Sequence, residues 1–126
     1  MSAYDELLQD VTVVAKECGR DPATVKIVVA SKYFSVETIQ ELYNLGIRDF
    51  GENKVQDFLA KKGSLPNDIN WHFFGRLQKN KINKIKGECS LIHSIDSLEL
   101  GQALSERIDH PQDILLQVNI SQEEQK

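Results

Sequence analysis

The stretch KIVVASK, residues 26–32, decides the fold of this chain. Residues 26–31 form a short apolar run with β-branched side chains, which is typical of a strand buried on both faces of a parallel sheet. A helix is expected after it, because Ser35 can cap a helix whose apolar residues recur at helical spacing, and Gly46 can end it. The stretch therefore predicts one strand–helix unit of an α/β protein.

The same unit recurs along the rest of the chain. Apolar runs predict further strands at residues 47–50, 71–75, 90–95 and 113–120. Helical periodicity predicts a helix between successive strands, and one more helix at about residues 3–18, ahead of the first strand. Strands that alternate with helices imply a parallel sheet with right-handed crossovers.

Two architectures fit this alternation: a doubly wound sheet of the flavodoxin type, and part of an eight-stranded barrel. A doubly wound sheet normally covers its last strand with a helix, whereas this sequence stops soon after the fifth predicted strand. A receiver-like fold would carry acids after its first and third strands, where this chain has Ser31, Lys32, Phe74 and Gly75. We therefore expect a single domain, residues 1–126, that forms a parallel (β/α) TIM barrel truncated after about five strands. Its strands should follow chain order, with helices on the convex side only.

The composition is that of an ordinary soluble protein, with 126 residues, 40% hydrophobic residues and 27% charged residues. No apolar run approaches the ~20 residues that span a bilayer, and the acidic start does not resemble a secretory signal. Cys18 and Cys89 lie far apart and form no CxxC pair, which favours reduced thiols. We therefore expect a cytoplasmic protein with no membrane partner.

The net charge of −4 argues against a nucleic-acid partner. One segment departs from this acidic balance and contains no carboxylate. It carries Arg76, Lys79, Lys81, Lys84 and Lys86. The pattern predicts a helix whose basic face lies in solvent. A site for an anion or a partner is the alternative.

Polar side chains follow the predicted strands, and in parallel βα folds function lies at the carboxyl ends of the strands. Among them, Lys32 is the strongest candidate for a residue that reacts with a ligand. Because side chains alternate along a strand, Val28, Ala30 and Lys32 share one face. If that face lines a barrel, desolvation disfavours the ammonium and favours the neutral amine that attacks an aldehyde. The alternative is a lysine that simply enters solvent after a strand.

Asn53 follows a strand and opens a helix, so its side chain either caps that helix or lies beside a bound ligand. The histidines His72, His93 and His110 show no metal-ligand spacing, and no metal site is predicted. His72 and His93 alternate with apolar residues in their strands, so we expect them in the core or at its rim.

Five stretches, taken together, resemble one family. They are VVASK (28–32), RDFGENKVQ (48–56), WHFFGRLQKNK (71–81), LIHSIDS (91–97) and LLQVNISQEEQK (115–126). In this order they are similar to the pyridoxal phosphate homeostasis proteins, also called proline synthase co-transcribed proteins. That family is a single-domain relative of the barrel domain of alanine racemase.

The resemblance implies a barrel of the alanine racemase N-terminal type that binds pyridoxal 5′-phosphate (PLP). Lys32 matches the family's lysine that holds PLP as a Schiff base, and Asn53, in GEN, matches an asparagine beside the cofactor. Members of the family are cytoplasmic and have no established turnover reaction. The implied role is therefore a non-enzymatic carrier that buffers PLP and delivers it, with PLP-dependent apoenzymes as partners.

The sequence matches the N-terminal half of the family only, because the family continues past Lys126 into strands that carry the phosphate cradle. Two alternatives to the carrier remain. A PLP-dependent, racemase-like enzyme needs a second base facing the lysine across the ring, and Tyr33 is expected on the opposite side of the strand from Lys32. A ligand-free fragment without the phosphate site is the other. Whichever alternative holds, a barrel truncated after about five strands leaves open sheet edges, and these predict self-association.

Overall fold

The structure, a computed structural model, describes residues 2–120, and its sheet confirms the predicted alternation. Five parallel strands pair in the order β1-β2-β3-β4-β5. They are β1 (Val29–Ala30), β2 (Asp49–Glu52), β3 (Asn70–Phe73), β4 (Leu91–Ile95) and β5 (Ile114–Leu116). Neighbours in the chain are neighbours in the sheet, so the strand order is that of a (β/α) barrel and not of a doubly wound sheet.

Helices connect the strands, and their ends follow the sequence signals. They are α1 (Ala3–Glu17), α2 (Val36–Asn44), α3 (Val55–Lys62), α4 (Ile82–Ile85) and α5 (Leu98–Arg107), with 3₁₀ turns η1 (Pro22–Thr24) and η2 (Lys79–Lys81). Ser35 Oγ accepts a hydrogen bond from the Thr38 N–H at 3.1 Å and so caps α2 as predicted. Gly46 follows α2 with a φ of 104°, a backbone conformation that favours glycine.

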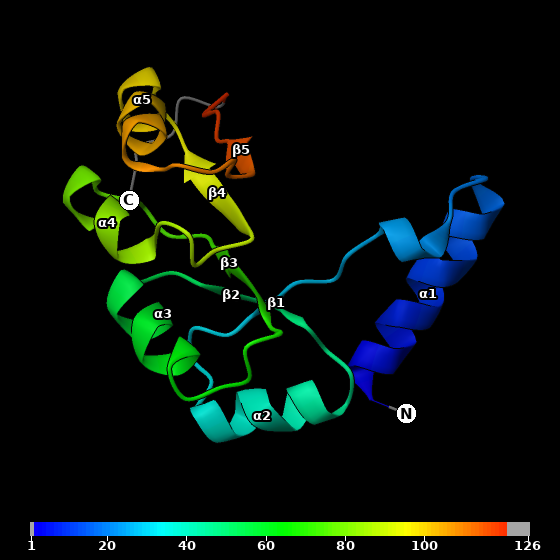
Figure 1. The fold of residues 1–126 in the computed structure, drawn as a ribbon. Helices are drawn as coiled ribbons and strands as arrows, with labels where there is room; N and C mark the ends of the chain where they lie inside the picture. Colours follow the sequence, from blue (N-terminus) through cyan, green and yellow to red (C-terminus); the bar gives the residue numbers. More distant parts are fainter. Residues whose placement is uncertain (1, 121–126) are drawn as a thin grey trace.

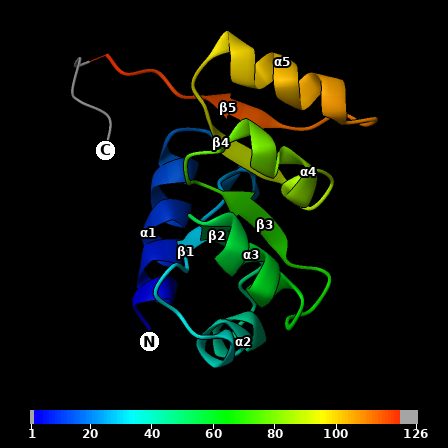
Figure 2. The same cartoon turned by 90° about the vertical axis from the view of Figure 1, so that its left-hand side faces the viewer.

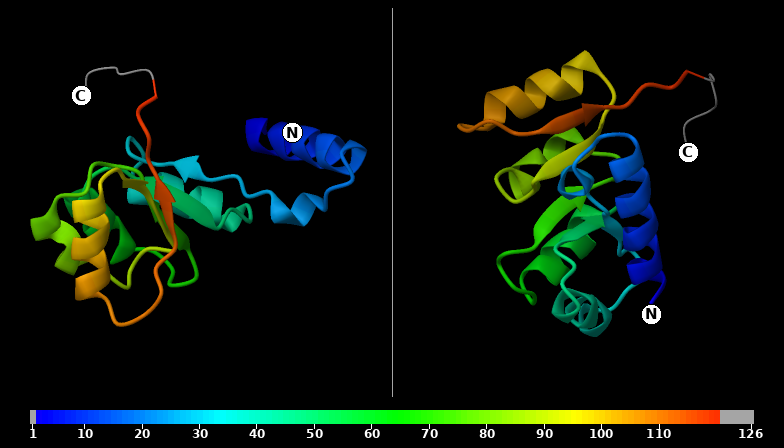
Figure 3. Two further views of the ribbon diagram at one scale, coloured as in Figure 1. Left: turned by 90° about the horizontal axis from the view of Figure 1, so that it is seen from above. Right: turned by 90° about the vertical axis from the view of Figure 1, so that its right-hand side faces the viewer.

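The four crossover helices lie side by side along one face of the sheet. α2, α3, α4 and α5 follow one another there in chain order, as Figures 1 and 2 show. α1 lies on the other side of the strands, where the right-hand view of Figure 3 places it in front of the sheet. The prediction of helices on one side only therefore holds for the crossovers and is wrong for α1, which precedes the first strand and packs against η1.

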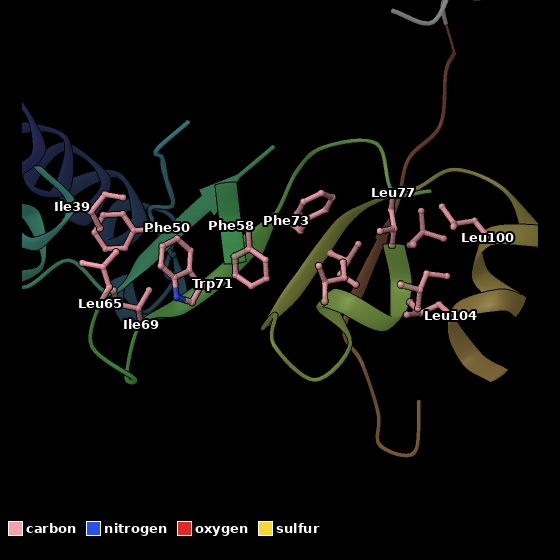
Figure 4. Packing of buried hydrophobic residues seen from close by; sticks show 14 of the residues in the cluster. Ile39, Phe50, Phe58, Leu65, Ile69, Trp71, Phe73, Leu77, Leu100 and Leu104 are labelled. Atoms are coloured by element: carbon pink, nitrogen blue, oxygen red, sulfur yellow. The ribbon is translucent and has the colours of Figure 1, made fainter. Parts of the chain in front are cut away.

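The hydrophobic core fills the space between the sheet and the crossover helices. Figure 4 shows its side chains in a continuous row, with strand residues facing helix residues. The largest buried members are Phe50, Phe58, Trp71 and Phe73. The ring of Phe58, from α3, meets Trp71, from β3, edge-on with centroids 5.6 Å apart. Burial of these rings fixes the helices onto the sheet.

The strands at the two ends of the sheet are shorter than predicted. β1 covers only Val29–Ala30 of the expected 26–31, and β5 covers Ile114–Leu116 of the expected 113–120. Within residues 2–120 each of them pairs with a strand on one side only, and an edge strand has fewer hydrogen bonds to hold it extended. The stretch LLQVNISQEEQK of residues 115–126 lies partly outside the described residues.

The basic segment is not the regular helix that was predicted. η2 and the one-turn helix α4 divide it, and its buried residues are Leu77, Ile82 and Ile85. Both cysteines are free thiols, and burial raises the pKa of Cys89 to about 12.

In the part of the chain from residue 2 to residue 120, no helix is both long enough and apolar enough to cross a bilayer.

Candidate functional site

The residues predicted to carry chemistry meet at one edge of the sheet. Ser31 continues the pairing of β1 with β2, since its N–H donates to the Gly51 carbonyl at 2.9 Å. Lys32 follows it directly, and Asn53 directly follows β2. Because the strands are parallel, both residues lie at the carboxyl end of the sheet. The structure thus brings the two candidate residues to neighbouring strand ends.

Lys32 lies in a turn and is exposed. The Phe34 N–H donates to the Ser31 carbonyl at 3.0 Å and closes this turn. Because the Lys32 side chain is exposed among residues 2–120, the desolvation expected inside a closed barrel is not seen there. The prediction that Tyr33 points away from Lys32 is wrong: Lys32 Nζ lies 4.7 Å from the centroid of the Tyr33 ring. Strand alternation stops at Ala30, so it does not apply to the two residues of the turn.

A buried ion pair, which sequence reasoning missed, fixes the backbone beside Lys32. Glu52 is fully buried, and Lys61 Nζ lies 3.0 Å and 3.1 Å from its two carboxylate oxygens. The Ser31 hydroxyl also donates to this carboxylate. Lys61 Nζ donates a further bond to the Ser31 carbonyl at 2.8 Å. Glu52 and Lys61 therefore hold the residue that precedes Lys32 between β2 and α3.

Replacing Glu52 by alanine is expected to destabilise the fold by about 3 kcal/mol or more, because it leaves the Lys61 ammonium without its buried counter-charge. Urea denaturation at neutral pH measures the loss. The matched control is Glu52→Ala with Lys61→Met, which removes both charges and should recover part of the stability. A single variant as stable as the parent would contradict the role given to this pair.

Asn53 does not cap α3. The N-cap position is Lys54, and no side chain bonds the first turn of the helix. The capping alternative is therefore wrong. Gly75 contacts the Asn53 backbone so closely that a Cβ at Gly75 would overlap the Asn53 carbonyl. Ser94 Oγ in turn donates to the Gly75 carbonyl at 2.5 Å, so backbone contact fixes Asn53 next to β3 and β4.

The sheet face opposite the crossover helices carries a chain of polar side chains. His72 Nε2 lies 3.0 Å from Asp49 Oδ1, and His72 Nδ1 lies 2.9 Å from His93 Nε2. Burial, together with the neighbouring His72, lowers the pKa of His93. Phe74 packs edge-on against His93 with a centroid distance of 4.6 Å, and it lies over Gly51, where any Cβ would overlap its ring.

His72 is buried, at 4% exposed, and His93 is half-buried, both on the sheet face opposite the hydrophobic core. Asp49 accepts from His72, and a neutral His72 can then accept from His93. Within residues 2–120 no group of three or more His, Cys, Asp or Glu side chains is placed to hold a metal ion.

Curated proteins of known family resemble the chain in sequence. No family model matches it. The pyridoxal phosphate homeostasis protein of Aquifex aeolicus is 39% identical over 100% of the chain and 58% of its own length. That of Pseudomonas aeruginosa is 40% identical over 89% of the chain and 50% of its own length. The chain spans about half the length of the curated relatives it matches.

Solved structures resemble the chain in fold. PipY of Synechococcus elongatus without PLP superposes with a TM-score of 0.72 and 33% identity, over 87% of this chain and 54% of PipY. PipY with PLP bound gives a TM-score of 0.63 and 36% identity, over 77% of this chain and 47% of PipY. Sequence and fold point to the same relatives, and the chain is similar to the pyridoxal phosphate homeostasis proteins over about half of their length.

Proposed function

We propose that the chain binds PLP as a Schiff base on Lys32 and serves PLP homeostasis by buffering and delivering the cofactor. The observation that carries this proposal is the place of Lys32, at the carboxyl end of the first strand of a sheet that superposes on PipY with PLP bound. The carboxyl ends of barrel strands are where ligands bind in this architecture.

Lys32 and Lys61 differ in whether their amino groups are free to react with an aldehyde. Lys61 Nζ is held by Glu52 and by the Ser31 carbonyl. Lys32 Nζ has no carboxylate within 4.0 Å among residues 2–120, and its side chain is exposed in a fixed turn. A free amine condenses with an aldehyde to an imine and releases one water molecule. Lys32 therefore fits a cofactor whose reactive group is an aldehyde, and Lys61 does not.

A carrier fits the site better than a racemase does. Racemisation needs a second base on the face of the ring opposite the lysine. Tyr33, the nearest candidate, lies against Lys32 itself. The relatives are named as homeostasis proteins. An enzyme of the racemase type therefore remains the second candidate, and it requires a second base on the opposite face of the ring.

The remaining parts of the proposal concern the whole protein. Residues 1–126 form the N-terminal portion of one (β/α)8 PLP-binding domain. The protein is cytoplasmic, its partners are PLP-dependent apoenzymes, and neither nucleic acid nor membrane is a partner. A fragment that binds no ligand is the competing possibility, since the chain spans about half of its relatives.

Absorbance titration with PLP tests the proposal against its competitors. A carrier gives a new visible band that saturates with PLP and gives no turnover of amino acids. A racemase-like enzyme gives the same band together with interconversion of L- and D-amino acids, measured by chiral chromatography. The absence of a band, both in this chain and in a chain extended to the length of its relatives, would contradict PLP binding.

Replacing Asn53 by alanine is expected to weaken PLP binding by about tenfold and to leave the Schiff base intact. The amide offers one or two hydrogen bonds, each typically worth ~0.5–1.5 kcal/mol. Titration of the visible band in the extended chain measures the change. Asn83→Ala, at an exposed position of α4, is the matched control. Complete loss of the band in a folded Asn53→Ala variant would contradict a tuning role.

A further inference from the structure

A groove lies on the helix side of the rim, between the start of α3 and the η2–α4 segment. α3 and α4 lie next to each other there, as Figures 1 and 2 show. The groove has a volume of about 540 Å³. Its lining draws cationic side chains from three separate stretches of the chain. They are Lys54, Arg76, Lys81 and Lys84. Among the residues from 2 to 120, none that lines it carries a carboxylate.

These four cations differ from the other basic residues nearby in having no counter-charge. Lys62 Nζ lies 3.2 Å from Glu88, and Lys79 Nζ lies 3.2 Å from Glu99. Within residues 2–120 none of the four groove cations has a carboxylate within 4.0 Å. Like charges around one hollow repel each other, and a bound anion relieves that repulsion. In a chain of net charge −4, this grouping is a local exception.

The lysines of the basic segment fall into two groups, those bound to other partners and those that line the groove. A plain solvated helix would not show this division. Lys79 and Lys86 turn to other partners, since Lys79 pairs with Glu99 and Lys86 Nζ donates to the Arg107 carbonyl at 3.1 Å. Lys81 and Lys84 line the groove instead. Lys54 joins them from a different strand–helix connection. The convergence arises because α4 packs beside α3.

The lining also indicates the class of ligand. Four positive charges exceed what a single phosphate needs, and they suit a ligand that carries two or more linked phosphates. Gln56 and Gln78 add neutral hydrogen-bonding groups, and Val55 and Leu59 add an apolar wall. We propose that this groove is a binding site for a small polyphosphate, which adjoins the site of Lys32 because Asn53 also lines the groove. Its cations lie on three segments, so a compact anion can contact several of them at once.

Isothermal titration of the 126-residue chain with pyrophosphate, at physiological salt, tests the site. We expect saturable binding of one equivalent, with inorganic phosphate at least about tenfold weaker because it carries less charge. Lys81→Ala with Lys84→Ala should weaken pyrophosphate binding about a hundredfold, since each lost charge-assisted bond typically weakens binding about tenfold or more.

The matched control is Lys79→Ala with Lys86→Ala, which removes the same charge from the same segment outside the groove. It should change the affinity less than threefold. Equal losses in the two double variants, or no binding by the parent chain, would overturn the proposal. So would tighter, salt-sensitive binding of a single-stranded RNA that depends on both lysine pairs. Circular dichroism checks folding, and the single charge reversals Lys84→Glu and Lys86→Glu replace any double variant that fails to fold.

Discussion

Replacing Lys32 by alanine in a chain extended to the length of its relatives is expected to abolish the visible band that PLP produces. The amine of Lys32 is the only group at that position that can form an imine with the aldehyde. The neighbouring Lys61 cannot take its place without leaving its buried bonds to Glu52 and the Ser31 carbonyl. Loss of the band should therefore be complete.

Two further variants separate the chemistry from the charge. Lys32→Arg keeps a positive charge at the rim but forms no such imine, and it should lose the band as completely as Lys32→Ala. Lys54→Ala removes an exposed lysine that follows the next strand, and it should keep the band. Reduction with borohydride followed by peptide mapping identifies the modified residue. An adduct on any lysine other than Lys32 would refute the assignment.

The order of the strands could be predicted from the sequence because it depends on a repeated pattern. Each strand–helix unit carries its own signals, such as the Ser35 cap and the positive-φ Gly46, and parallel pairing of successive units follows from them. The extent of the outer strands could not be predicted in the same way. It depends on how many neighbours a strand has, and periodicity within a strand does not reveal that.

The sequence indicates which residues follow a strand, but it does not indicate which side chains from different elements come into contact. Asn53 directly follows β2 and Lys32 comes two residues after β1, so the parallel register places both at the carboxyl edge of the sheet, and their role there stays a prediction. The bond between Glu52 and Lys61 depends on how α3 packs on β2, and nothing in the spacing indicated it. The groove of Lys54, Arg76, Lys81 and Lys84 likewise exists only once two helices lie side by side.

The 126-residue chain is expected to bind PLP far more weakly than a chain extended to the length of its relatives. The resemblance to the family implies that later strands hold the cofactor's phosphate. Two charge-assisted hydrogen bonds at ~1.5–3 kcal/mol each correspond to a loss of about a hundredfold to ten-thousandfold. The imine on Lys32 and contacts near Asn53 would remain as the only attachments.

The same comparison should show self-association of the 126-residue chain. Apolar side chains are exposed along α1, where Val13 and Val14 are 51% and 56% exposed. They are exposed again at the last strand, where Leu116 and Val118 are 74% and 71% exposed. In the described part of the chain, both β1 and β5 pair on one side only. Open strand edges and unpartnered apolar faces favour association with a second copy.

PLP titration and analytical ultracentrifugation of the two chains, side by side, decide this prediction. The extended chain should bind tightly and should cover the apolar surfaces of α1 and β5 within one molecule. The shorter chain should bind weakly and sediment as a concentration-dependent oligomer, and Leu116→Lys should shift it towards the monomer by placing a charge on the open edge. A monomeric 126-residue chain that binds PLP as tightly as the extended one would mean that the phosphate is held by groups already present. In that case the groove of Lys54, Arg76, Lys81 and Lys84, which Asn53 also lines, would be the first place to look for it.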